Sequence, residues 1–246
     1  MFQHSASIFV LAFGLMPHAT GQSRKSSESS GALGARALSF FQPRQGENVD
    51  QFLKRIRVPQ LSPPRKARMI ALLPKEGEVQ PSARGQAKLA ALGPVLEYHE
   101  RGAALDLRVI RAGQLFVGLY ARAAVLITEE ALDLLTTEEL QAVVAHELAH
   151  EYFSDEYELA REREQCDLAQ ELELRCDGVA IITMIRLGLD PRRLISAVRK
   201  FTRFGEVAGA EALARFYPSR DERTRFMRAM IELVKAREFG PALAWK

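Results

Sequence analysis

The hydrophobic and polar positions of this chain change their period near residue 128. Before that point, three short segments rich in Val, Ile, Leu and Phe are typical of β-strands. They are 106–111, 114–119 and 123–128. Other segments repeat apolar residues at helical spacing. They are 82–101 (with a kink expected at Gly93-Pro94), 129–135, 137–153, 167–187, 190–204 and 219–236. The pattern predicts an α+β fold that is mainly helical and has a small three-stranded sheet.

The helical segment 137–153 contains the pentapeptide His146-Glu147-Leu148-Ala149-His150. Residues four apart share one face of a helix, so His146 and His150 are placed to bind one metal ion together. Glu147, beside the first histidine, is placed to act as a general base on a metal-bound water. The alternative is a pair of hydrogen-bonded core histidines.

This helix is expected to be buried. Thr136 and Glu139 have the spacing of a capping box at its start. Mostly Leu, Val and Ala follow them. Polar side chains inside so apolar a segment cost free energy unless a partner satisfies them, and a metal ion would do so.

A catalytic zinc ion usually has three protein ligands. In 167–187, Glu173 and Asp177 lie on one otherwise apolar helix face, whereas Glu171 lies nearly opposite and is expected to be solvated. We expect Glu173 to be the third ligand and Asp177 to accept a hydrogen bond from a ligating histidine. The alternative is that Glu173 is part of the helix surface. One zinc ion per chain is expected, although this donor set also suits other divalent ions.

The acidic run 155–164 alternates with arginine and is expected to be an exposed turn region. Cys166 and Cys176, ten residues apart, would be separated by about 15 Å on one helix. That distance is too long for a disulfide. Cys176 either packs as a small buried residue beside the metal site or provides a thiolate ligand.

The first 21 residues contain no charged side chain, and an apolar run from Ile8 to Met16 is followed by Ala19-Thr20-Gly21. This pattern predicts a cleavable export signal over 1–21 and a periplasmic or secreted protein, although it has no positively charged start. Residues 22–63 are rich in Ser, Gly, Gln, Arg and Pro. We interpret them as a flexible basic linker with a short helix around Val49 to Ile56. Residues 64–246 then form the domain.

Charge is distributed unevenly along the chain. Residues 22–70 contain ten Lys or Arg and three Asp or Glu, a net charge of +7, while the remainder has a net charge of −4. This basic arm is either a solvated linker or a weak contact to the envelope or membrane surface. No basic motif with interleaved aromatic residues is present, so no nucleic-acid partner is expected.

Together, these motifs carry a resemblance to a known family. His146-Glu147-x-x-His150 with Glu173-x-x-x-Asp177 resembles the gluzincin zinc endopeptidases of the HtpX and CAAX-prenyl-protease (Ste-type) family, over residues 84–236. The resemblance implies a zincin-like domain, in a compact, soluble, exported version. It also implies an edge strand that binds the substrate backbone by β-addition. Phe116, Val117 and Gly118 correspond to that strand.

Three features depart from the family pattern. The interval between His150 and Glu173 is short, and Phe116 stands near the place of an asparagine on the family's edge strand. A His-Pro pair followed by Arg reads Tyr217-Pro218 and then Arg223. Tyr217 is either a donor to the oxyanion of the reaction or a core aromatic residue. Arg223 serves either the active site or a structural ion pair.

The sequence therefore predicts a zinc metalloendopeptidase that acts on protein or peptide substrates. Its water nucleophile would be activated by Glu147. The alternative is a non-catalytic zinc-binding chaperone or adaptor on a peptidase scaffold.

Overall fold

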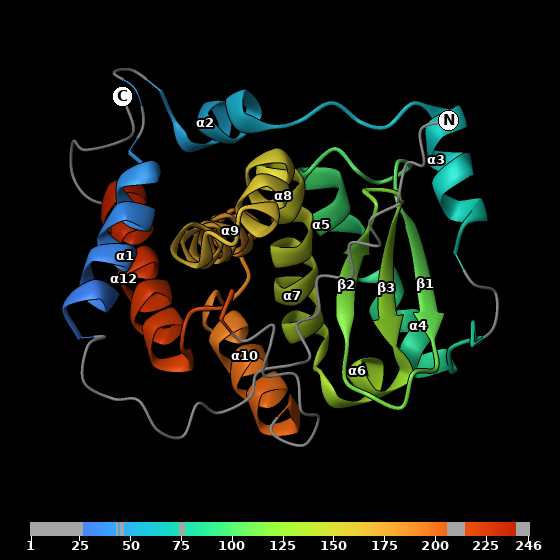
Figure 1. Ribbon diagram of the computed structural model, residues 1–246. Helices are drawn as coiled ribbons and strands as arrows, with labels where there is room; N and C mark the ends of the chain where they lie inside the picture. Colours follow the sequence, from blue (N-terminus) through green and yellow to red (C-terminus); the bar gives the residue numbers. More distant parts are fainter. Residues whose placement is uncertain (1–26, 43, 45–46, 74–76, 206–214, 240–246) are drawn as a thin grey trace.

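The computed structural model describes residues 27–42, 44, 47–73, 77–205 and 215–239 (Figure 1). Its elements, in chain order, are α1 (Ser27–Phe40), α2 (Val49–Ile56), α3 (Pro63–Ala71), α4 (Ala83–Ala90), α5 (Gly93–Tyr98), β1 (Asp106–Ile110), β2 (Val117–Tyr120), β3 (Ala124–Thr128), α6 (Glu129–Leu134), α7 (Thr137–Ala149), the 3₁₀-helix η1 (His150–Phe153), α8 (Ser154–Glu162), α9 (Cys166–Arg186), α10 (Arg192–Gly205) and α12 (Arg220–Phe239). The expected α+β fold with a small three-stranded sheet is confirmed.

The sheet has the order β1-β3-β2, with β1 parallel and β2 antiparallel to β3. Every residue of β3 is buried, as expected for a central strand. β2 and β3 are joined by a tight turn in which Ala121 and Arg122 adopt positive φ angles of 46° and 58°. Within the described residues β2 pairs with β3 alone, so it is an edge strand.

Helix α7 lies between the sheet and α9, in the centre of the molecule (Figure 1). The expected capping box is present: Thr136 Oγ1 accepts from the Glu139 N–H, and Glu139 Oε2 accepts from the Thr136 N–H. All residues from Glu139 to Ala149 are buried. A helix so enclosed holds its side chains in fixed directions, which is what a metal site requires.

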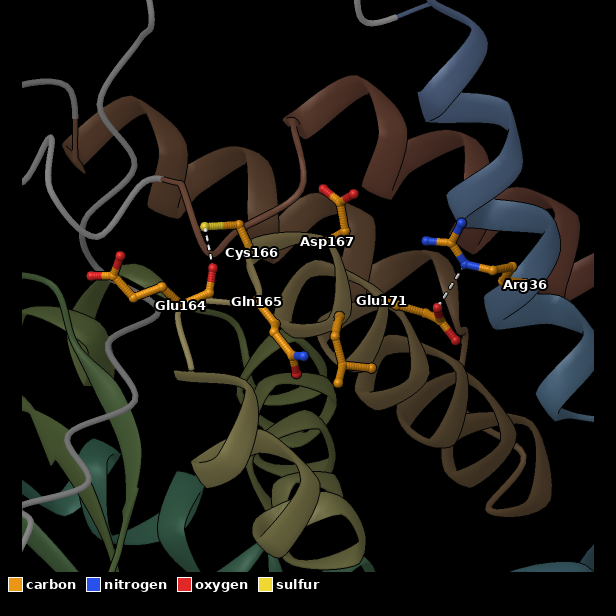
Figure 2. Close-up of a pocket in the computed structure, with 7 residues that line it drawn as sticks. Arg36, Glu164, Gln165, Cys166, Asp167 and Glu171 are labelled. Atoms are coloured by element: carbon orange, nitrogen blue, oxygen red, sulfur yellow. Dashed lines mark hydrogen bonds and ion pairs between the residues drawn. The ribbon is translucent and has the colours of Figure 1, made fainter. Parts of the chain in front are cut away.

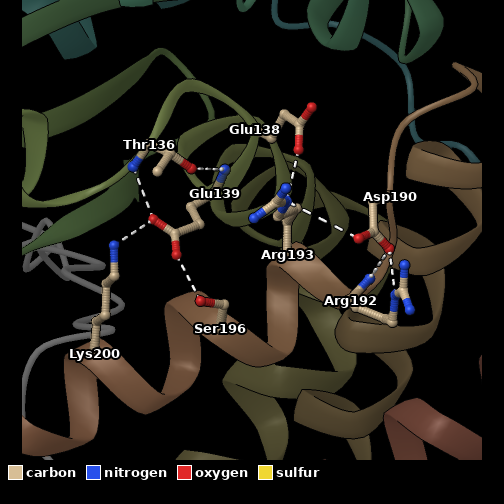
Figure 3. A network of polar contacts seen from close by, with 8 residues as sticks. All are labelled: Thr136, Glu138, Glu139, Asp190, Arg192, Arg193, Ser196 and Lys200. Atoms are coloured by element: carbon tan, nitrogen blue, oxygen red, sulfur yellow. Dashed lines mark hydrogen bonds and ion pairs between the residues drawn. The ribbon is translucent and has the colours of Figure 1, made fainter.

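The start of α7 is fastened to α10 by polar contacts (Figure 3). Glu139 is buried and accepts hydrogen bonds from Ser196 Oγ and Lys200 Nζ, both at 2.6 Å. Glu138 forms an exposed ion pair with Arg193. Burial alone would raise the pKa of Glu139, but Lys200 and the other donors outweigh it and lower that pKa. The carboxylate therefore stays ionised and stabilises the position of α7.

The interpretation of residues 22–63 as a flexible linker is wrong for α1. Helix α1 packs against α9 and α12, on the side of α9 away from the sheet (Figure 1). Its Leu33 and Ala37, and Phe41 directly after its last residue, are buried at four-residue spacing in the main core. The Ser- and Gly-rich composition of the segment concealed this narrow stripe, which three residues are enough to form. The short helix expected at Val49 to Ile56 is present as α2.

The contact of α1 with α9 depends on a glycine. A Cβ atom added at Gly178 of α9 would lie 2.4 Å from two ring atoms of Phe41. Only a residue without a side chain allows this approach.

Part of the charge of the basic arm is used within the molecule. Four of its ten cations pair with carboxylates: Arg36 with Glu171, Arg55 with Glu47, Arg57 with Glu100 and Lys66 with Asp106. Three of these carboxylates belong to the domain that follows, so these ion pairs join the arm to that domain. Glu171, expected to be solvated, is instead buried between Arg36 and Arg175.

Two further segments differ from expectation. The segment 82–101 breaks into the separate helices α4 and α5 at the place where a kink was expected, with Pro94 in the first turn of α5. The acidic run expected as an exposed turn is helix α8, because Tyr157 and Ala160 point into the core. The predicted signal at 1–21 lies outside the described residues. Among those described, no helix is long and apolar enough to cross a membrane.

Replacing Gly178 with alanine tests the close packing of α1. The added methyl group must displace Phe41, so we expect Gly178→Ala to lower the free energy of unfolding by about 1–3 kcal/mol. Gly34→Ala in α1 is the matched control, because its Cβ would meet nothing within 4 Å. The control should raise stability by about 0.5–1 kcal/mol. Urea unfolding measures both; equal effects of the two changes would contradict the packing described.

Candidate metal centre

The two histidines of α7 converge as their spacing predicts. His146 Nε2 and His150 Nε2 lie 3.2 Å apart, and the rings meet edge to face at 82°. His146 is fully buried and His150 almost so. His146, Glu147 and His150 present ligand atoms that all lie within 4.8 Å of one another.

Helix α9 brings Glu173 to the same point. Its Oε2 lies 3.4 Å from His146 Nε2, and its Oε1 lies 3.7 Å from His150 Nε2. Tetrahedral zinc with bonds of about 2.0–2.1 Å separates its ligand atoms by about 3.3 Å. The three separations observed are close to that value, so the donor set and its spacing fit a zinc ion. Each oxygen of Glu173 lies within 3.7 Å of a histidine nitrogen, so Glu173 is the candidate third ligand.

Asp177 and Arg223 lie on the Nδ1 side of His146. Asp177 Oδ1 lies 2.9 Å from His146 Nδ1, and Arg223 Nε donates to Asp177 Oδ2 at 2.8 Å. All three side chains are buried. This contact leaves His146 Nε2 as the metal-facing nitrogen. Burial alone would lower the pKa of His146, but Asp177 and Glu173 outweigh it and raise that pKa to about 9.

Glu147 lies between the two histidines in sequence and contacts the sheet. Its Oε2 accepts a hydrogen bond from the Leu119 N–H of β2 at 3.2 Å. Its Oε1 is buried and has no hydrogen-bond partner among the described residues. Burial raises the pKa of Glu147 to about 8. A carboxylate oxygen held in this way is available to a molecule that enters the site.

Tyr157 is a site residue that the sequence interpretation missed. Its hydroxyl donates to Glu173 Oε1 at 2.9 Å, and its ring packs edge to face on His150. Because residues 155–164 were expected to form an exposed turn, Tyr157 was not a candidate for the site. The apolar spacing of Phe153, Tyr157 and Ala160 was the signal that indicates a buried helix face there.

Cys176 lies beside the centre and not in it. Its Sγ is 3.5 Å from His150 Nδ1, the ring nitrogen opposite the one that faces Glu173. Burial raises the pKa of the Cys176 thiol well above its ordinary value. The packing role considered for Cys176 therefore fits, and the thiolate-ligand alternative does not. Both cysteines are free.

Tyr217 and Arg223 occupy different places. Tyr217 lies within electrostatic reach of Glu173 and Glu147, and burial of its hydroxyl raises its pKa above the ordinary range. The guanidinium of Arg223 is forked onto Asp177 through two nitrogens. Arg223 thus forms the buried ion pair that was one of its two expected roles. Tyr217 interacts electrostatically with the two carboxylates of the candidate site.

The expected substrate strand adjoins Glu147. The Phe116 carbonyl accepts from the Thr128 N–H on β3, and the Leu119 N–H points to Glu147. Because backbone groups alternate along an antiparallel strand, Phe116 and Gly118 turn theirs toward β3, while Val117 and Leu119 turn theirs away from it. All four residues are buried. Of Phe116, Val117 and Gly118, Val117 is the residue whose backbone points away from the sheet.

A surface cavity of about 590 Å³ lies elsewhere, between α1 and the start of α9 (Figure 2). It is lined by Arg36, Glu164, Gln165, Cys166, Asp167, Leu168 and Glu171. It shares no residue with the metal-ligand cluster. Its walls are part of the contact that holds α1 in place.

The fold is that of a zincin-like α+β protein, and two histidines and a carboxylate converge in it at a candidate metal centre. Residues 109–166 match the model of the family described as Peptidase family M48. No curated protein matches the chain. The family match supports a metallopeptidase, a hydrolase of peptide bonds that typically uses zinc. It covers β2, β3 and α7 but ends before Glu173, Asp177 and Arg223, so the geometry alone connects these three to the site.

Removing the buried cation tests the support behind His146. Arg223→Met leaves the Asp177 carboxylate without its ion pair in a fully buried position, so we expect a loss of about 3–5 kcal/mol in unfolding free energy. Arg228→Met, an exposed position on the same helix, should change stability by less than about 0.5 kcal/mol. Thermal and urea unfolding measure both. An Arg223→Met variant with an unchanged unfolding free energy would contradict the importance of this ion pair.

Proposed function

We propose that this protein is a zinc-dependent endopeptidase of the HtpX and CAAX-prenyl-protease type, in a compact and soluble version. One observation carries the proposal. His146, His150 and Glu173 converge at zinc-ligand spacing, and a buried, unpartnered oxygen of Glu147 lies beside them. Three ligands leave a fourth position for water or substrate, which distinguishes a catalytic zinc site from a structural one.

Zinc held by these three side chains would polarise the scissile carbonyl and bring the pKa of water toward ~7. Glu147 accepts the proton of the attacking water at Oε1. It then delivers that proton to the nitrogen of the leaving amine. The Leu119 N–H holds Oε2 and thereby fixes the direction of Oε1. Asp177 keeps His146 in the tautomer that binds metal, and Arg223 keeps Asp177 ionised.

Tyr217 is our choice of donor to the oxyanion. Its hydroxyl is within electrostatic reach of both Glu147 and Glu173, and burial keeps it protonated. Arg223 acts through Asp177 and His146, since its forked contact is directed at Asp177. One neutral donor placed at the developing charge is the usual arrangement for such stabilisation.

The substrate is proposed to be a protein or peptide in extended form. It would pair with the outward backbone groups of β2 at Val117, next to Glu147. Pairing of this kind forms hydrogen bonds with the backbone of the substrate and does not depend on particular side chains. It therefore supports an endopeptidase of broad sequence preference.

The alternative is a zinc-binding chaperone or adaptor that uses the same scaffold without catalysis. The unpartnered oxygen of Glu147 favours the enzyme, because burying a carboxylate in this way costs stability and serves no binding role. A protein that binds zinc stoichiometrically and holds unfolded proteins without cleaving them would instead support the alternative.

Glu147→Gln tests the mechanism. The amide cannot accept the proton of water, so we expect cleavage of casein or an unfolded protein to fall at least about 100-fold while bound zinc stays at one ion per chain. Glu138→Gln, on the exposed side of the same helix, should keep its activity. Removing zinc with a chelator should abolish cleavage and restoring zinc should recover it. An active Glu147→Gln protein would refute the assigned role.

We further propose that the protein acts in the periplasm or outside the cell, after removal of residues 1–21. The charge-free apolar run and the small residues before Gly21 support this. Arg65 and Arg68 on α3 are exposed. The proposal therefore includes a weak contact between this helix and the envelope surface. Mass spectrometry of the protein recovered from a host's periplasm should give a chain beginning near Gln22. An intact cytoplasmic chain would overturn the proposed location.

A further inference from the structure

The two histidines of the centre are oriented by different means. His146 has a carboxylate at its Nδ1, provided by Asp177. Within the part of the chain that the structure describes, the contact at His150 Nδ1 is the Cys176 thiol, 3.5 Å away, which is a weak hydrogen-bonding group. Something other than a carboxylate must therefore hold the second ligand in place.

Tyr157 is the side chain that contacts both remaining ligands. It comes from α8, within the short interval between His150 and Glu173, and it is 2% exposed. Its ring centroid lies 5.4 Å from that of His150, with the planes at 81°. Its hydroxyl donates to Glu173 Oε1 at 2.9 Å. A single residue thus contacts one ligand with its ring and the other with its hydroxyl.

The hydrogen bond distinguishes the two oxygens of Glu173. Oε1, which accepts from Tyr157, lies 3.7 Å from His150 Nε2. Oε2 lies 3.4 Å from His146 Nε2. Because the Tyr157 hydroxyl holds Oε1, Oε2 is the oxygen better placed to bind a cation. A tetrahedral zinc site uses one bond from each ligand, so one free oxygen is enough.

We propose that Tyr157 is a positioning residue that holds Glu173 through one oxygen and fixes the His150 ring, and so sets the metal affinity of the centre. The inference rests on the proposed zinc site. It assigns Tyr157 a role toward the ligands, not toward the substrate. Groups that orient metal ligands typically contribute 10- to 100-fold in affinity.

Tyr157→Phe is the decisive variant, because it keeps the ring that packs on His150 and removes only the hydroxyl. We expect its dissociation constant for zinc, measured by competition with a chelator of known affinity, to rise about 10- to 100-fold. At saturating zinc it should still bind one ion per chain. The cobalt(II) absorption spectrum should change, because the carboxylate is no longer held through one oxygen.

Tyr152→Phe is the matched control. Tyr152 also hydrogen bonds a buried histidine, His99, through its hydroxyl at 2.8 Å, but it contacts none of the proposed ligands in the interactions described. Any general cost of losing a buried tyrosine hydroxyl should appear in both variants during urea unfolding. The loss of zinc affinity and the altered cobalt spectrum should appear in Tyr157→Phe alone.

Several results would overturn the inference. Unchanged zinc affinity in Tyr157→Phe would do so. So would intact affinity with a large fall in turnover, since that result would make Tyr157 a donor to the substrate. A parent protein that binds no zinc would overturn both this inference and the proposed function, whereas a zinc-binding parent with an unaffected variant overturns the inference alone.

Discussion

The structure depends on the burial of two carboxylates where α7 and α9 meet. Glu173 and Asp177 are both almost completely enclosed, and a charge in such a place is costly unless a cation and hydrogen bonds compensate for it. Asp177 has Arg223 and His146 as partners. Glu173 has two imidazoles and a tyrosine hydroxyl, a set of contacts that a divalent ion would complete.

The surrounding elements serve to keep this junction rigid. The capping box and the Glu139 contacts fix the start of α7. Helices α1 and α12 pack against α9 on the side away from the sheet. The arm that precedes the domain is part of this support, since its first helix fits against Gly178, next to Asp177. Its cations neutralise carboxylates of the domain. The arm is thus a structural part of the protein rather than a tail attached to it.

The comparison with known proteins and the geometry are complementary. The family match stops at residue 166 and so includes the two histidines and Glu147. Glu173, the proposed third ligand, and the pair Asp177 and Arg223 are brought to the histidines by the positions of α9 and α12 in space. Agreement between these independent observations is the reason that we favour a peptidase over a scaffold with a structural metal ion.

The sequence by itself determined the periodic features. The three strands, the long helices, the capping box at Thr136 and the four-residue spacing of the histidines follow from local rules that need no distant contact. It also indicated that Glu173 and Asp177 share a face, because that too is a property of one helix. These features define the fold class and most of the ligand set.

The tertiary structure alone decided the rest. Whether the segment of α1 packs or remains a linker depends on the contact between its three buried apolar residues and α9 at Gly178. Whether Arg223 faces Asp177 or the substrate depends on how α12 crosses α9. Tyr157 and Glu171 became buried because α8 and α1 close over them. Partners far apart in sequence are selected by packing, and no local pattern records that choice.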